Sequence, residues 1–167
     1  NQLTTIDVSG NISLIGLYLD NNQLTNIDLS SNTALTHLSL SYNQLKSIDL
    51  SRNVTLTYLY LNGNQLTSID VSSNTSLTEL NLSWNKLTSI DLSNNTSLTR
   101  LFWERNPFED ISTMTVGETY VINDNIKVPS DKKVTYSIED TSIAKLENGV
   151  ITALKNGTTR LIIDAGY

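Results

Sequence analysis

The stretch NQLTSIDVSSNTSLTELNLSW, from Asn64 to Trp84, decides the fold because the same unit recurs along most of the chain. Its first asparagine returns 21 positions later as Asn85, and the leucine at Leu77 returns as Leu98. The asparagines at this position of the unit are Asn1, Asn22, Asn43, Asn64, Asn85 and Asn106. A fixed period of this length indicates a stack of structural repeats, in which each unit buries its apolar side chains against its neighbours.

Each unit contains two short segments in which apolar and polar residues alternate. Leu38-Ser39-Leu40 is one example and Ile48-Asp49-Leu50 is another. Alternation of this kind places one side chain inward and the next outward, as on a β-strand. Stacked units are expected to pair both segments in parallel, about 4.8 Å apart. The prediction is an all-β, two-sided solenoid of about five coils over residues 1–108, with little or no helix and little curvature.

The leucine pattern carries a resemblance to a known family. Leu35, Leu38, Leu40, Asn43 and Leu45 read LxxLxLxxNxL, which resembles the leucine-rich repeat family. A second half-motif follows inside the same unit, at Leu45, Ile48, Leu50 and Asn53. This nesting is similar to the short, 21-residue class of bacterial leucine-rich repeats.

Two columns of asparagine are predicted to point inward at the turns of the stack. One column is Asn22, Asn43, Asn64, Asn85 and Asn106, and the other is Asn11, Asn32, Asn53, Asn74 and Asn95. An amide side chain both donates and accepts hydrogen bonds, so it can pair the backbone groups that a buried turn exposes.

Residues 109–167 have a different character, with short alternating segments and turn dipeptides. Asn148-Gly149 predicts a tight hairpin turn, and Asn156-Gly157 predicts another turn. The segments Val116–Thr119, Tyr136–Asp140, Ile143-Ala144 and Asn148–Ala153 resemble, in their order and spacing, bacterial immunoglobulin-like modules of group 2. The resemblance implies a second domain over 109–167, an Ig-like β-sandwich whose last strand is either absent or beyond Tyr167.

A leucine-rich solenoid followed by an Ig-like module resembles the arrangement of bacterial internalin-type adhesins. That resemblance implies an extracellular or bacterial cell-surface location. Because the chain opens on Asn1, it is expected to be part of a longer protein. Trp103, Phe108 and Ile111 are predicted to join the cores of the two domains.

Composition excludes several classes of function. The chain has 11 Lys and Arg against 17 Asp and Glu, a net charge of −6, no cysteine and one histidine, His37. It therefore has no disulfide, thiolate nucleophile or multi-histidine metal site, and it lacks the basic surface of a nucleic-acid-binding protein. No apolar run approaches the ~20 residues of a membrane helix, so membrane insertion is not expected. No catalytic residue, metal or cofactor is predicted.

Comparison of the repeats predicts where a partner binds. Positions that point outward around the first strand differ from coil to coil and carry most of the aromatic side chains, whereas the other side repeats. The predicted partner-binding residues are Tyr18, His37, Tyr42, Tyr58, Tyr60, Glu79, Trp84, Arg100, Phe102 and Arg105. Tyr, Trp and Arg are enriched in binding hot spots, although aromatic residues also favour strand surfaces without any binding role. The favoured function is adhesion to a protein partner, with a structural spacer and a carbohydrate-binding surface as alternatives.

The opposite side carries a row of identical carboxylates, each followed two positions later by serine. These aspartates are Asp7, Asp28, Asp49, Asp70 and Asp91. Like charges stacked about 4.8 Å apart repel one another. We expect hydrogen bonds from neighbouring hydroxyl or backbone groups to offset this repulsion, with bound calcium as the alternative.

Overall fold

The computed structural model describes residues 1–106, 114–122, 126–159 and 161–167, and the described part is all-β, without helix. In the repeats the strands are β1 (Gly16–Tyr18), β2 (His37–Ser39), β3 (Tyr58–Tyr60), β4 (Glu79–Asn81), β5 (Ile90–Asp91) and β6 (Arg100–Phe102). In the region after the repeats, which keeps the name second domain from the sequence prediction, they are β7 (Thr119–Val121), β8 (Ile126–Lys127), β9 (Thr135–Ile138), β10 (Ala144–Glu147), β11 (Val150–Ala153) and β12 (Leu161–Asp164).

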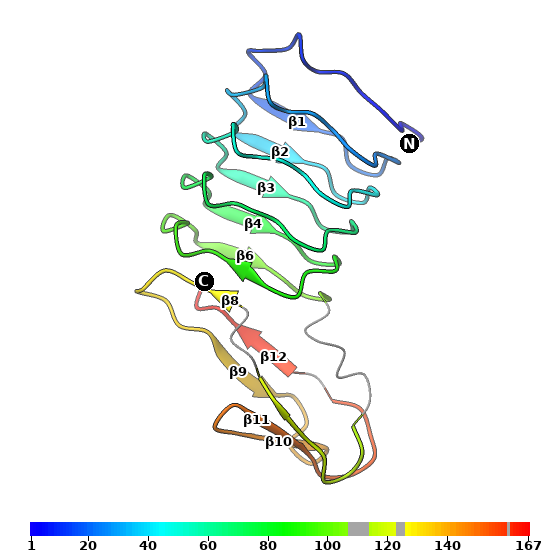
Figure 1. Cartoon of the computed structure of the whole chain (residues 1–167), viewed down its shortest axis with the longest axis vertical. Coiled ribbons are helices and arrows are strands. Elements are labelled where there is room, and N and C mark those ends of the chain that lie inside the picture. Colours follow the sequence, from blue (N-terminus) through cyan, green and yellow to red (C-terminus); the bar gives the residue numbers. More distant parts are fainter. Residues whose placement is uncertain (107–113, 123–125, 160) are drawn as a thin grey trace.

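The repeats form stacked coils joined by one parallel sheet, in the order β1-β2-β3-β4-β6 (Figure 1). The register follows the 21-residue period, so Leu38 lies beside Leu59 and Leu59 beside Leu80. These three leucines are fully buried. The predicted parallel ladder and all-β solenoid are therefore confirmed for this side of the coils.

The prediction of a second ladder on the aspartate side is wrong. Only β5 is a strand there, and it pairs with β8 of the second domain rather than with a neighbouring coil. Each of these segments turns almost at once: the Asn53 amide donates to the Leu50 carbonyl, and the Ser51 amide donates to the carboxylate of Asp49. The segments thus contribute apolar side chains to the core but are too short to form a ladder.

The first asparagine column uses both ends of its amide. Asn64 Nδ2 donates to the Leu40 and Leu61 carbonyls, and its Oδ1 accepts from the Leu45 amide. Asn43 and Asn85 repeat the pattern, and all three side chains are buried. One side chain thereby links backbone groups of successive coils, as predicted.

The side chains of the second asparagine column form hydrogen bonds only through the Nδ2 donor of the amide. Asn74 Nδ2 donates to the carbonyls of Leu50 and Asn53 in the preceding coil. Its Oδ1 is buried without a hydrogen-bond partner, and the same holds at Asn32, Asn53 and Asn95. The two columns therefore differ in what they contribute, although the sequence predicts the same role for both.

The second domain contains two small antiparallel units, β10-β11-β7 and β12-β9. The predicted hairpin is present: Glu147 pairs with Val150, and the intervening Asn148 and Gly149 have φ of 51° and 76°. The assignment of these strands to an Ig-like sandwich stays a prediction.

The two domains meet at the last coil. The pairing of β5 with β8 continues the solenoid into the second domain, and β8 lies next to the last coil (Figure 1). Ile126, Val128 and Tyr167 pack against the leucine core. Trp103 is partly buried against the same core, as predicted. Phe108 and Ile111, the other predicted bridging residues, lie outside the described residues.

Replacement of Asn64 by alanine is expected to lower the free energy of unfolding by about 1–3 kcal/mol, because it leaves buried backbone groups unpaired. Asn74→Ala should cost less, because only two hydrogen bonds are lost and an unpaired oxygen is removed with them. Denaturant melts of both variants check the order. Exposed Asn94→Ala is the control and should stay within roughly 0.5 kcal/mol of the parent. Equal losses at Asn64 and Asn94 would contradict the assignment.

Candidate binding face

The strand face is the outward surface of the parallel sheet, and the register places its side chains in two rows. One row is Gly16, His37, Tyr58, Glu79 and Arg100; the other is Tyr18, Ser39, Tyr60, Asn81 and Phe102. Seven of the predicted binding residues lie in these rows. Neighbours within a row come from successive coils, so they contact one another across the ladder.

Aromatic contact links the second and third coils on the strand face. The rings of His37 and Tyr58 stack with their centroids 4.6 Å apart and their planes 22° from parallel. His37 Nδ1 also lies 2.7 Å from the Thr36 hydroxyl. Both rings are half-buried, so the stack fixes their positions before any partner arrives.

Glu79 is predicted as an outward contact residue, but its side chain is buried beneath its neighbours. Its carboxylate accepts from the Tyr60 hydroxyl at 2.8 Å and from Arg100 Nη1 at 2.9 Å. Arg100 remains exposed and also lies over the ring of Phe102, 5.2 Å from the centroid. Glu79 therefore positions Tyr60 and Arg100 rather than offering a free charge.

Burial is the main cause that raises the pKa of Tyr60 to about 12, with the hydrogen bond and the charge of Glu79 adding to it. The phenol is consequently neutral throughout the physiological range and acts as a hydrogen-bond donor to Glu79.

The other three predicted residues lie beside the strand face, in a turn column formed by Asn21, Tyr42, Gly63, Trp84 and Arg105. All five residues have a left-handed backbone, with φ between 55° and 72°. This conformation suits glycine but costs a non-glycine residue roughly 1–2 kcal/mol. Hydrogen bonds to the next coil hold it: the Tyr42 amide donates to the Asn62 carbonyl and the Trp84 amide to the Glu104 carbonyl.

Sequence reasoning named Tyr42, Trp84 and Arg105 but missed their strained backbone. The available signal is Gly63, which occupies the same position of the unit in the third coil. A glycine at one copy of a repeated turn indicates a left-handed position in every copy.

A polar ridge lies between the strand face and the turn column. Asp20 accepts from the Ser39 hydroxyl and from the Ser41 amide, and the Ser41 hydroxyl donates to Asn62. Further along, the Ser83 hydroxyl donates to Glu104 at 2.8 Å. These bonds join successive coils and hold the carboxylates in place.

The aspartates on the opposite side are stabilised by hydrogen bonds, as expected. Asp28, Asp70 and their equivalents each accept from the backbone amide of the serine two positions later, at 2.9–3.0 Å. The hydrogen bonds from serine hold the pKa of each carboxyl below its ordinary value. For Asp91, Ser93 and then Lys127, at 3.1 Å, lower the pKa to about 2. Within the described ranges no group of three or more acidic or histidine side chains could hold a metal ion.

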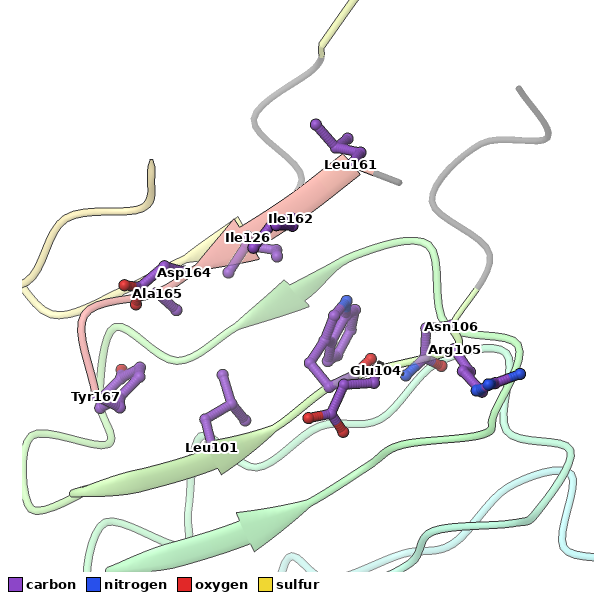
Figure 2. Close-up of a pocket in the computed structure, with 11 residues that line it drawn as sticks. Leu101, Glu104, Arg105, Asn106, Ile126, Leu161, Ile162, Asp164, Ala165 and Tyr167 are labelled. Atoms are coloured by element: carbon purple, nitrogen blue, oxygen red, sulfur yellow. Dashed lines mark hydrogen bonds between the residues drawn. The ribbon is translucent and has the colours of Figure 1, made fainter. Parts of the chain in front are cut away.

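A pocket lies between the last coil and the second domain (Figure 2). Leu101, Trp103 and Asn106 line it from the solenoid, while Ile126 and Tyr167 line it from the other domain. The Tyr167 hydroxyl is buried without a partner, and burial raises the pKa of this phenol to about 12. Apolar and polar side chains both line the pocket, and Arg105 is the one lining residue that was predicted to bind a partner.

Known proteins match both parts of the chain. Residues 33–74 and 54–94 match the profile of Leucine Rich repeats (2 copies), residues 76–116 match Leucine Rich Repeat, and residues 117–166 match the hyaluronate lyase N-terminal beta-sheet domain. The solved functional domain of InlJ from Listeria monocytogenes, which includes a cysteine ladder, is 36% identical with a TM-score of 0.61, over 70% of this chain and 26% of that one. The internalin InlF from the same organism is 30% identical with a TM-score of 0.59, over 64% of this chain and 33% of that one. No curated protein matches.

The five-stranded parallel ladder and these matches show that the chain belongs to the leucine-rich repeat proteins. Within that class its sequence and fold are similar to those of the solved Listeria monocytogenes internalins. It spans about a quarter to a third of the length of the solved internalin chains. The described residues include no helix long and apolar enough to cross a membrane.

Folding stability is expected to fall between pH 10 and pH 12 partly through Tyr60. Its pKa is raised in the folded state, so its contribution is complete below pH 10 and is lost as the pH rises toward 12. Tyr60→Phe removes the titrating group and should give a shallower loss in that range, measured by denaturant melts against pH. A slope identical to that of the parent would contradict the burial of the phenol.

Protonation of the aspartate row in acid is expected to lower the stability of the fold. Each folded-state pKa lies below the ordinary value of 3.8, so the stabilisation is present above that pH and is lost as the pH falls toward 2. Carbon-detected NMR titration should give Asp91 a pKa near 2. Ser93→Ala removes the hydrogen bond from the Ser93 hydroxyl, which lowers this pKa most, and should move the pKa of Asp91 up toward 3.8. An unchanged value would rule out the serine hydroxyl as its cause.

Proposed function

We propose that the chain is a non-catalytic adhesion module of a bacterial surface or secreted protein, and that it binds a protein partner through the strand face. The observation that carries the proposal is a rigid, variable surface on a uniform scaffold. Its rows change from coil to coil, while the leucines and asparagines beneath them repeat.

Preorganisation supports this role. His37 is stacked on Tyr58, and Glu79 fixes Tyr60 and Arg100, so these side chains lose little conformational entropy on binding. Exposed Tyr18 and half-buried Phe102 supply apolar area at the two ends of the sheet. Tyrosine and arginine on a rigid surface are typical hot-spot residues.

Charge is distributed unevenly along the strand face and the adjoining polar ridge. Arg100 is exposed near the second domain, whereas the Asp20 carboxylate lies near the first coil. A partner with complementary charges would dock in one orientation, and its association rate would depend on salt. The similarity to the internalins supports an adhesive role at a cell surface.

Binding is tested with the full chain on a sensor surface, presented with purified ectodomains of host-cell and bacterial surface proteins. Replacement of Tyr18 and Tyr58 by alanine should weaken the complex by about 2 kcal/mol or more if they are hot spots. The measurement is the dissociation constant by surface plasmon resonance, with melting curves to confirm that the variant folds.

Asp49→Ala and Asp70→Ala serve as matched controls on the opposite side and should leave the affinity unchanged. If these changes abolish binding while the tyrosine changes leave the affinity unaltered, the partner binds the aspartate side of the solenoid and the proposal is wrong. If no ectodomain binds, the spacer alternative replaces the adhesion module.

A further inference from the structure

We propose that the turn column is a separate site for a linear carbohydrate chain, with Tyr42 and Trp84 as the two stacking rings. The proposal does not depend on the protein partner of the strand face. It comes from the placement, exposure and surroundings of these two side chains.

The first observation is that exposed rings occupy positions where glycine would be free of strain. Tyr42 and Trp84 have φ of 55° and 59°, and Gly63 occupies the same turn between them. The two residues are 54% and 52% exposed, so burial does not compensate for the backbone they adopt. Strain at an exposed residue is typical of a binding site, where the side chain serves a ligand rather than the fold.

The second observation is that the rings are held in place and leave an open surface. A Cβ atom on Gly63 would lie 2.6 Å from Cδ1 of Tyr42, so the Tyr42 ring rests on the bare glycine backbone. The Arg105 guanidinium lies over the Trp84 ring, 4.2 Å from the centroid. Each ring therefore leans on the next coil along the stack, and each keeps about half its surface in solvent.

Spacing indicates the shape of the ligand. Tyr42 and Trp84 lie two coils apart, which places them about 10 Å from each other along the stack. That is the distance spanned by a disaccharide unit of an extended glycan, so one linear chain could place alternate sugars on the two rings.

The surroundings favour a sugar over an apolar peptide. The exposed and half-buried residues that flank the column carry hydrogen-bonding groups: Asn62 and Glu104 on the ridge, and Gln44 and Gln65 two positions beyond the turn. The side-chain amides of Gln44 and Gln65 form no hydrogen bond within the described residues. Each side chain therefore keeps a donor and an acceptor for the hydroxyl groups of a sugar.

At one end, Arg105 lies over the Trp84 ring and exposed Lys86 follows Trp84 by two residues in the sequence. Neither residue forms an ion pair within the described part of the chain. Their free donors suit hydroxyl or carboxylate groups of the sugar bound at that ring.

The test uses the full chain and an array of linear hexasaccharides, neutral ones of the cellulose and chitin types and acidic ones containing uronic acids. Binding is quantified by isothermal titration calorimetry. At least one chain should bind, and Trp84→Gly and Tyr42→Gly should each weaken it about tenfold or more, equivalent to about 1.4 kcal/mol. Absence of binding by every hexasaccharide would overturn the proposal.

Glycine is the most informative substitution because it removes the aromatic ring and also relieves the strain of the left-handed backbone. The melting temperature of both variants should therefore stay the same or rise. A fall in melting temperature that accompanies lost binding would show that the rings support the fold, and would overturn the proposal. Tyr18→Ala, on the strand face, should keep the full sugar affinity; its loss would place the sugar on the strand face instead.

Discussion

The structure depends on one recurring interaction, the hydrogen bonds that an inward asparagine makes with the backbone of its own coil and of its neighbours. A coil that turns without helix or hairpin leaves carbonyl and amide groups buried and unpaired, and each costs about 1–3 kcal/mol. Asn64 and its equivalents supply both a donor and an acceptor to these groups. The leucine core supplies the driving force for stacking, but the asparagines make the turns compatible with burial.

The same geometry explains how strained side chains are tolerated. The left-handed residues Tyr42 and Trp84 immediately precede Asn43 and Asn85. The backbone amides of Tyr42 and Trp84 donate to carbonyls of the next coil. The turn is thus fixed on both sides by bonds that do not involve the side chain. Any residue can be placed there at the expense of backbone strain, so the position is available for function.

Sequence reasoning predicted the solenoid and its register because the leucine and asparagine periods record backbone positions directly. It failed for the second ladder, since Ile48-Asp49-Leu50 alternates like a strand and nothing in the alternation shows that Asp49 captures the Ser51 amide and ends the segment. It also misjudged Glu79, because an outward position on an isolated strand becomes buried once Tyr60 and Arg100 close over it from adjacent coils. The local alternation predicts whether a side chain points toward the core or toward solvent. Contacts with side chains of neighbouring coils then determine whether it remains exposed.

One side of the coil repeats and the other varies because their side chains bond to partners at different distances along the chain. Asp28 and Asp49 bond to serines two positions ahead, within their own coils, so each copy satisfies itself and the unit repeats unchanged. Only Asp91 reaches beyond its coil, to Lys127, where the stack meets a different domain. On the strand face the partners lie in adjacent coils, so a change at one position alters what its neighbours contact. A surface built from contacts between coils can therefore differ along its whole length, and a uniform stack can present a different set of side chains in every coil.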